Sequence, residues 1–518
     1  MSRPQQACKL TGDTLKRVII IGGGVTGLGA AFKIRRAAQA GHEVEFVLVE
    51  KDSRLGGKLV TEVVEDPETG GQFVVDGGSD AFITEKPGVH RIAKLLGIFE
   101  DETPTCDENK KTLIVKKRKL IELPDGIMMF APTKILPMAT TSLYSWPAKF
   151  RMALDLFLPR KERWAEGETA QQHDESLESF VVRRMGRESL DRLAEPLVGG
   201  VHASDPALMS LAATFPSLLE MEQQYGSLVR GFLAQRKKVE AIKKRYPLKP
   251  GAKRRTFFTS FLKGMQFFTD RIADAAGRDQ IRTGVSAAPL RRTDDGGWEV
   301  ELDNGEVLSG DAVIVATEGW AAANLVAQVE PGIAELLGQI PFSSSATVPM
   351  AFRAEDCPFD TRFFGILCPL VEGRPVMAVT MSSSKWPDRA PAGRVLLRGF
   401  VGGPRNQEVM EKSDDELIEI VRQQLVEILG VKAEAKPLFA RVFRWTDGMP
   451  QYTMGHLDRI DEVEARTAAI PGLALAGGSY RGVGIPNCLE SGERAVSKVL
   501  GEFGMVLEED SAQEQRIY

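Results

Sequence analysis

A glycine-rich turn between a buried strand and a helix is the strongest constraint on how this chain can fold. Val18 to Ile21 is a β-branched run typical of a buried parallel strand, and helix-forming residues run from Leu28 to Ala40. Between them, Gly22 to Gly27 matches the pattern GxGxxG. A second apolar run, Val44 to Val49, ends in Glu50. The sequence therefore predicts a strand–helix–strand unit of the dinucleotide-binding type.

Each position of this unit has a physical task. Gly22 permits the tight turn out of the strand, Gly24 lacks the Cβ that would block a pyrophosphate, and Gly27 lets helix and strand approach closely. The helix N-terminus then receives the phosphates. Glu50 can accept hydrogen bonds from both ribose hydroxyls and repels a 2′-phosphate, which argues against NADP. We expect this part of the site to comprise Gly22, Gly23, Gly24, Val25, Thr26, Gly27, Glu50 and Lys51.

Two further segments favour FAD over NAD. Arg54 to Lys58 (RLGGK) follows the acidic strand end with a glycine pair for close backbone approach and an arginine that can pair locally or meet phosphate. A plain glycine turn is the alternative interpretation. Leu473 to Ile485 predicts a buried strand and a glycine turn, and its helix from Asn487 can present backbone amides to a flavin. Because these segments lie far apart in the chain, the cofactor domain must be discontinuous.

The remaining sequence predicts an α/β fold, with a discontinuous Rossmann-type FAD-binding domain, a β-rich substrate domain and a helical subdomain. The strand-like runs Val376 to Met381 and Val395 to Val401 indicate the β-rich part, and Asp414 to Leu429 is patterned as an amphipathic helix. Lys116 to Lys119 separates two short strands as a hairpin turn. We expect 15–95, 256–320 and 455–505 in the FAD-binding domain, 96–122 and 321–454 in the substrate domain, 123–255 in the helical subdomain, and 506–518 as a disordered tail.

Composition excludes several classes of protein. A formal net charge of -5 over 518 residues leaves no global basic surface for nucleic acid. Five scattered cysteines without a CxxC pair argue against a disulfide framework and against a zinc or iron–sulfur site, so no metal is expected. The sequence has neither an apolar signal region nor a window of 18 apolar residues, which favours a protein of the reducing cytoplasm.

Two segments leave membrane contact open. Ile135 to Leu158 carries aromatic and aliphatic residues with Lys149 and Arg151 between them, and Pro137 and Pro147 are expected to interrupt its helices. This pattern favours either a helix on a lipid surface or a helix facing another domain. Arg236 to Arg255 holds ten basic residues and one acid, which favours a solvated helix and linker over contact with an anionic membrane. Peripheral attachment to the cytoplasmic membrane face is therefore the alternative to a purely cytoplasmic location.

Several separated motifs resemble the flavin monoamine oxidase superfamily, and within it the oxygen-dependent protoporphyrinogen oxidases of haem synthesis. Besides the two glycine segments near residues 22 and 56, they are Asp76 to Phe82 (DGGSDAF), Pro124 to Pro132 (PDGIMMFAP), Val201 to Pro206 (VHASDP), Phe443 to Tyr452 (FRWTDGMPQY) and Tyr480 to Cys488. They follow the order of the family from Val18 to about Leu500. The chain departs from it at Ser79, where the family has proline, and at Ala81, where it has serine.

The resemblance implies a reaction and a set of contacts. The reaction is the six-electron oxidation of protoporphyrinogen IX to protoporphyrin IX, with hydride passing to flavin N5, O2 as acceptor and H2O2 as product. No catalytic side chain is identified, because flavin N5 carries the chemistry. Candidate pocket residues are Lys111, since Lys111 or Thr112 lies near the place where eukaryotic members hold a propionate with arginine, and Leu367, Met377 or Thr380, and Phe400, for which simple packing is the alternative. Implied FAD contacts are Arg54, Gly57, Lys58, Gly78, Ser79, Asp80, Ala81, Val285, Trp445, Gly478, Val483, Gly484 and Ile485.

Other functions remain as alternatives. A related group oxidises coproporphyrinogen III, which has more propionates and would need more cations. Amine oxidases need a lysine near flavin N5 and an aromatic cage, whereas Tyr480 to Ile485 offers one aromatic residue; a carotenoid desaturase or a non-catalytic flavoprotein is further removed. The expected partners are a porphyrinogen, O2, a ferrochelatase that receives the porphyrin, and a second copy of the chain, since homodimers are the commonest oligomers.

Overall fold

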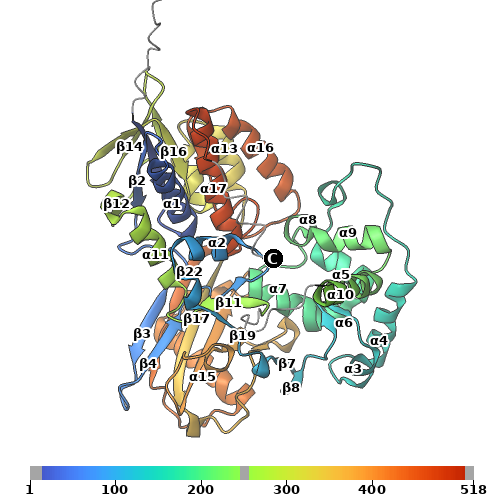
Figure 1. Cartoon of the computed structure of the whole chain (residues 1–518). Helices are drawn as coiled ribbons and strands as arrows, with labels where there is room; N and C mark the ends of the chain where they lie inside the picture. Colours follow the sequence, from blue (N-terminus) through green and yellow to red (C-terminus); the bar gives the residue numbers. More distant parts are fainter. Residues whose placement is uncertain (1–14, 246–255, 508–518) are drawn as a thin grey trace, which may run out of the picture.

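The computed structural model describes residues 15–245 and 256–507 of the chain. The second half of the basic run, 246–255, and the acidic end, 508–518, lie outside the described residues. Figure 1 shows a parallel sheet with its helices in the upper part of the view, a large β-sheet below it, and a lobe of helices beside both. The expected α/β class with a Rossmann-type domain is confirmed.

The upper part is built on a five-stranded parallel sheet. Its order is β12 (Ile281–Thr283), β2 (Val44–Glu50), β1 (Lys16–Ile21), β16 (Ala312–Val315) and β23 (Leu473–Leu475). The central strands are β-branched and buried on both faces, as expected where helices cover both sides of a parallel sheet. Segments that are remote in the sequence thus form one sheet, whose carboxyl ends meet at one edge.

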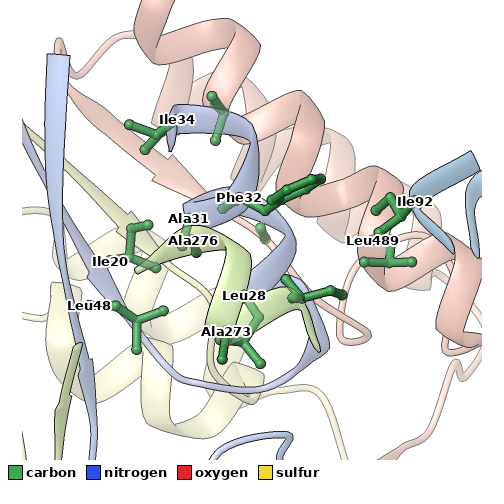
Figure 2. Packing of buried hydrophobic residues seen from close by; sticks show 14 of the residues in the cluster. Ile20, Leu28, Ala31, Phe32, Ile34, Leu48, Ile92, Ala273, Ala276 and Leu489 are labelled. Atoms are coloured by element: carbon green, nitrogen blue, oxygen red, sulfur yellow. The ribbon is translucent and has the colours of Figure 1, made fainter. Parts of the chain in front are cut away.

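Three helices cover one face of this sheet. Figure 2 shows Ile20 and Leu48 of the sheet packed under α1 (Val25–Gln39), with α11 (Gln266–Ala276) and α17 (Ile485–Glu502) beside it. A Cβ at Gly492 of α17 would lie 2.3 Å from the Thr26 carbonyl oxygen, so only glycine permits this separation of α17 from α1. The N-termini of these two helices are thereby held side by side.

The lower part is an eight-stranded sheet. Its order is β21 (Phe439–Ala440), β17 (Phe342–Arg353), β20 (Arg394–Gly402), β19 (Val376–Met381), β18 (Gly365–Leu367), β7 (Thr112–Lys116) and β8 (Lys119–Glu122), with β22 (Phe443–Pro450) also paired to β17. Leu417, Val421 and Leu425 of α15 (Asp414–Leu429) pack on one face. The predicted β7–β8 hairpin and the predicted helix at 414–429 are confirmed.

Two segments lie elsewhere than the sequence suggested. The hairpin of β3 (Thr61–Glu65) and β4 (Gln72–Asp76) was expected with the FAD-binding domain, yet Phe73 and Val75 pack on the eight-stranded sheet because they alternate as its apolar cover. Conversely, β6 (Glu102–Pro104) was expected with the substrate domain. It pairs with β11 (Phe258–Phe261), which was expected with the FAD-binding domain and also pairs with β5 (Phe82–Ile83). A three-stranded arm contains β13 (Arg291–Arg292), β14 (Trp298–Glu301) and β15 (Val307–Gly310).

A buried ion pair organises the helical lobe. Arg184, on α5 (Leu177–Met185), donates from Nε to Asp155 Oδ1 at 2.7 Å, and both side chains are fully buried. The other carboxylate oxygen of Asp155 accepts from the Ser227 hydroxyl at 2.6 Å, just before α10 (Leu228–Arg245). The lobe also contains α3 (Ile135–Thr140), α4 (Trp146–Ala153), α6 (Arg187–Ser189), α7 (Glu195–His202), α8 (Leu211–Thr214), α9 (Pro216–Tyr225) and the pair β9 (Ile127–Met128) and β10 (Ala131–Pro132).

The prolines at 137 and 147 do not interrupt helices as predicted. Each lies in the first turn of its helix, where the missing N–H has no intrahelical partner to lose, and the break falls at residues 141–145. Among residues 15–245 and 256–507, no helix is long and apolar enough to cross a bilayer. The remaining helices are α2 (Gly88–Leu95), α12 (Gly319–Val326), α13 (Pro331–Gly338), α14 (Ser382–Lys385) and α16 (His456–Ala468).

Candidate functional site

The first glycine turn separates structural glycines from one that faces open space. Gly22 has φ +111°, and a Cβ there would lie 2.6 Å from the Ala316 carbonyl oxygen. A Cβ at Gly27 would lie 1.9 Å from the Gly22 carbonyl oxygen. A Cβ at Gly24, the N-cap of α1, would meet no atom within 4 Å. The space before Gly24, at the start of a helix that continues through Val25 and Thr26, fits a pyrophosphate.

Glu50, at the end of β2, holds this turn in place through hydrogen bonds. Its buried carboxylate accepts from the Gly23 N–H at 2.6 Å and from the Asp52 N–H at 2.8 Å. Val285 lies next to it, because the Val285 N–H donates to the Glu50 carbonyl at 3.2 Å. Lys51 is exposed, and its ammonium lies 5.7 Å from the ring centroid of Trp320 on α12. The structure thus brings Glu50 and Val285 together at the sheet edge, while the Lys51 ammonium lies over an indole.

The RLGGK loop packs on the first glycine turn. Its Gly56 N–H donates to the Gly23 carbonyl at 2.8 Å, and the Cβ position of Gly57 lies 3.1 Å from Gly24 Cα. Arg54 donates to the carbonyls of Leu55 and Gly57, so its guanidinium holds the shape of its own loop. Lys58 forms an ion pair with Glu318 at 2.8 Å.

The second glycine turn, 477–484, lies beside α1. It connects β23 to α17, which begins at Ile485, after Val483 and Gly484. The Cβ position of Gly478 lies 3.5 Å from Cys488 Sγ. Burial raises the pKa of Cys488, although a hydrogen bond with the Thr26 side chain of α1 acts in the opposite direction. The two glycine turns therefore meet at the N-termini of two neighbouring helices.

The turn at 76–81 is the third segment of the site. A Cβ at Gly78 would lie 1.8 Å from the Lys58 carbonyl oxygen and 3.3 Å from Trp445 Cζ2, so this turn packs directly on the RLGGK loop. The Trp445 indole N–H donates to the Gly77 carbonyl at 3.3 Å. Ser79 is exposed and Ala81 is half-buried. Gly78 and Trp445 thus lie beside the RLGGK loop. This loop and the first glycine turn are called the cofactor loops below.

Asp80 is held by cations from the eight-stranded sheet and the helix after β19. Its carboxylate lies 3.0 Å from Lys385 Nζ, 3.3 Å from Arg398 Nη2 and 3.0 Å from the Trp386 indole nitrogen. Burial acts to raise the pKa of Asp80, but Lys385 and Arg398 outweigh it and hold the pKa well below its usual range. Arg398 also donates to the carbonyls of Asp76 and Gly78, both at 2.8 Å. The Asp80 side chain therefore fixes the turn.

Three of the five predicted pocket residues share one face of the eight-stranded sheet. The register pairs Leu367 with Ala378 and Ala378 with Phe400, and it pairs Thr380 with Arg398. This face is opposite to α15, and the Arg398 guanidinium lies 4.9 Å from the Phe400 ring centroid. Because Arg398 binds the 76–80 turn, the face that carries Leu367, Thr380 and Phe400 abuts the cofactor loops.

The strand register does not place the other two predicted pocket residues, Met377 and Lys111, on this face. Met377 lies at a β-bulge, where the register shifts between Val376 and Ala378, and its sulfur lies 2.8 Å from the Cβ position of Gly403. Lys111 is exposed just before β7, and its carbonyl accepts from the Phe364 N–H at 2.8 Å.

Sequence reasoning missed Arg398, Lys385 and Trp386. The signal for Arg398 was available, because an arginine in the middle of the apolar run Val395 to Val401 must be buried with a partner. His202, in the VHASDP motif, and His456, the first residue of α16, are structural. Burial lowers the pKa of His202 to about 4, and burial together with nearby arginines lowers that of His456 to about 4, so both are neutral at pH 7.

Gly24→Ala tests the space before α1. We expect the substitution to leave the fold intact, because its methyl group meets no protein atom, and to weaken FAD binding at least tenfold, or about 1.4 kcal/mol. FAD affinity of the apoprotein and its thermal melting measure the two effects. Gly338→Ala, which also faces open space but lies at the end of α13, is the matched control. Unchanged FAD affinity in Gly24→Ala would exclude the pyrophosphate from this position.

Asp80→Asn tests the charge cluster. The substitution leaves Lys385 and Arg398 buried without their anion, so we expect a loss of about 3 kcal/mol of stability at pH 7. Because pairing lowers the folded-state pKa below the ordinary value of 3.8, the Asp80 contribution is complete above that pH and declines below it. Urea unfolding from pH 7 to pH 3 should show a constant difference between the two proteins down to about pH 4 and the start of its decline below that, because the folded-state pKa lies lower still. The control is Asp303→Asn, at an exposed carboxylate in the turn between β14 and β15, which should keep the stability of the unaltered protein at each pH.

Comparison with known proteins gives the family. Residues 25–500 match the family described as "Flavin containing amine oxidoreductase". Coproporphyrinogen III oxidase of Bacillus subtilis (strain 168) is 32% identical over 494 residues, which cover 94% of this chain and 98% of that protein. The mitochondrial protoporphyrinogen oxidase of Nicotiana tabacum is 28% identical, covering 94% and 95% of the two chains.

A solved structure agrees over the same length. The putative protoporphyrinogen oxidase from Exiguobacterium sp. 255-15 superposes with a TM-score of 0.80 at 28% identity, covering 95% of this chain and 100% of that one. The glycine turns, the open space at Gly24 and the acidic end of β2 match the needs of a flavin dinucleotide. The chain belongs to the flavin-containing amine oxidoreductase family, and FAD is its cofactor.

Proposed function

We propose that this protein oxidises a porphyrinogen to the corresponding porphyrin in haem synthesis. The observation that carries the proposal is that Arg398, on the same largely apolar sheet face as Leu367 and Phe400, binds the 76–80 turn, which packs on the cofactor loops. A flat, mostly apolar macrocycle suits such a face. Relatives that bear the names of coproporphyrinogen and protoporphyrinogen oxidases support it. The porphyrin product is then the substrate of a ferrochelatase.

The proposed cofactor contacts are the three segments at Gly22 to Gly27, Arg54 to Lys58 and Gly478 to Ile485, with Gly78, Val285 and Trp445. When bound, FAD accepts hydride at N5 and passes electron pairs to O2, so three O2 become three H2O2 for each six-electron oxidation. The protein holds the substrate against this site and excludes water with its apolar sheet face. The neutral histidines and the fixed Asp80 leave proton exchange to the pyrrole nitrogens and solvent.

Protoporphyrinogen IX is the proposed substrate. Arg398, a cation on the sheet face, shares the Asp80 carboxylate with Lys385 and donates to two carbonyls, so these donors are already directed at the turn and away from additional propionates. Coproporphyrinogen III is the second candidate, because proteins of that name are among the relatives that cover nearly the whole chain. The two substrates differ in the number of carboxylates that the site must balance.

Turnover of both porphyrinogens by the purified FAD-loaded protein tests the proposal. We expect either substrate to bleach the flavin anaerobically, and protoporphyrinogen IX to show a kcat/KM at least tenfold higher, or about 1.4 kcal/mol, when porphyrin fluorescence is followed in air. A preference for coproporphyrinogen III would overturn the choice of substrate. Bleaching by amines alone would indicate an amine oxidase, and no bleaching at all would indicate a non-catalytic flavoprotein.

We also propose that α3 and α4 contact a lipid surface. The stretch 135–158 divides into two sets. Leu143, Tyr144 and Met152 are buried in the helical lobe, whereas Ile135, Leu136, Trp146, Phe150 and Phe157 are between 62% and 89% exposed. Phe157 also lines a groove of about 550 Å³ with Arg160, Arg163 and Arg230. Apolar side chains beside arginines suit a bilayer with anionic headgroups.

Vesicle sedimentation tests this contact. The FAD-loaded protein is mixed at low salt with vesicles of phosphatidylcholine and phosphatidylglycerol, and we expect it to pellet with them. The double variant Phe150→Ser/Phe157→Ser should lose at least tenfold in partitioning, because two exposed aromatic side chains no longer enter the interface. Val63→Ser/Val307→Ser, which removes exposed apolar groups outside the helical lobe, should pellet as before. Failure of the unaltered protein to pellet would refute the proposal.

A further inference from the structure

A short segment, 451–456, joins the helical lobe to the rest of the molecule. The Ser210 N–H of the lobe donates to the Tyr452 carbonyl at 2.8 Å, and the Met454 N–H donates to the Leu208 carbonyl at 3.1 Å. On its other side, the Gln451 N–H donates to the Pro341 carbonyl, just before β17, at 2.8 Å. The backbone of Tyr452 is therefore fixed between the lobe and the large sheet.

The side chain of Tyr452 closes the second glycine turn. Its buried phenol donates to the Gly478 carbonyl at 2.6 Å and accepts from the Gly482 N–H at 2.7 Å. Burial raises the pKa of Tyr452 well above its usual value, although the Gly482 N–H acts in the opposite direction, so the phenol keeps the proton that it donates. One hydroxyl thus joins the two sides of the turn.

His456 supports this arrangement from the first turn of α16. Its ring stacks on the Tyr452 ring with centroids 4.0 Å apart and planes 15° from parallel. Its Nε2 lies 2.8 Å from the Tyr480 carbonyl, to which a neutral Nε2–H tautomer donates. Three backbone groups of the turn, at residues 478, 480 and 482, are thereby held by two stacked side chains.

These bonds act together with two others, from the Gly477 N–H to the Ser491 hydroxyl at 3.0 Å and from the Gly319 N–H to the Ser479 hydroxyl at 2.8 Å. Gly477 and Gly482 have φ of +132° and +139°, so the chain reverses without regular secondary structure between β23 and α17. Backbone dipoles in such turns are fixed partial charges whose direction decides how they stabilise a bound group. A small rotation of the Gly478 or Gly482 peptide would alter the field at the site.

We propose that Tyr452 is a positioning residue for the flavin. It fixes the second glycine turn and thereby sets both the affinity for FAD and the balance between its oxidised and reduced forms. This inference rests on the proposed assignment of Gly478 to Ile485 to the FAD site. The contact between the helical lobe and 451–456 is thereby connected, through Tyr452, to the electronic environment of the cofactor.

Tyr452→Phe is the test, because it keeps the ring that stacks on His456 and removes only the hydroxyl. We expect at least tenfold weaker FAD binding. We also expect a shifted flavin absorption band and a reduction potential changed by about 30 mV, the equivalent of a tenfold difference between the two redox forms for two electrons. The control is Tyr144→Phe, at a buried phenol of the helical lobe whose oxygen has no partner within residues 15–245 and 256–507. It should leave the flavin properties unchanged.

Further measurements separate the possible outcomes. An unchanged FAD affinity, spectrum and potential in Tyr452→Phe, with or without a fall in melting temperature, would overturn the proposal. If Tyr452→Phe fails to fold, 4-aminophenylalanine is placed at position 452, where its amino group donates to the Gly478 carbonyl but no longer accepts from the Gly482 N–H. A reduction potential identical to that of the unaltered protein would then overturn the proposal as well.

The assignment of the turn to FAD is tested separately with Gly478→Ala. Its methyl group meets only Cys488 Sγ at 3.5 Å and Val483 Cα at 3.6 Å, so the fold accepts it. Unchanged FAD binding in this variant would refute the flavin contact itself, whatever Tyr452→Phe does. None of these measurements uses porphyrinogen turnover, so their results do not depend on the proposed substrate.

Discussion

The attachment of the 76–80 turn to the eight-stranded sheet depends on buried charge. Asp76 pairs with Arg389 at 3.0 Å, and Asp80 lies between Lys385 and Arg398, with the side chains almost fully enclosed. Such charges are costly to bury and become tolerable only when each has a partner and its remaining hydrogen bonds are made. Arg398 meets most of that demand by binding the carbonyls of the turn through Nη1, while its Nε has no partner within the described residues. The sheet face and the cofactor loops are consequently fixed relative to each other.

Local patterns in the sequence predicted local structure well. The unit from β1 to β2, the β7–β8 hairpin and the helix at 414–429 each follow from hydrophobic period, turn residues or end signals within a few residues. The dinucleotide glycines could also be assigned individual tasks, since an open Cβ position at Gly24 and closed ones at Gly22 and Gly27 are what their roles require. The family motifs then identified the flavin.

Interactions between remote residues could not be predicted in the same way. The partners of Arg398 lie more than three hundred positions earlier in the chain, and neither composition nor periodicity indicates which carbonyls it meets. Met377 lies at a β-bulge, which changes which side a residue faces and leaves no mark in the sequence, so its side of the sheet could not be predicted. The β3–β4 hairpin was assigned to the wrong neighbour because its apolar residues can cover any sheet. Tyr452 acts through a hydroxyl that no motif distinguishes from other buried phenols.

The order of strands in the parallel sheet has a consequence for biosynthesis. β1 and β2 leave the ribosome early, but β16 stands between β1 and β23, and β23 is made only after the whole eight-stranded sheet. Until then, one edge of β16 lacks its neighbour, and such long-range pairing forms slowly. The proposed FAD site, which uses turns from both sides of this gap, cannot form on a partly translated chain. Cofactor loading is thus postponed to the end of translation, and a truncated chain that ends before β23 would expose an unpaired strand instead of holding a flavin.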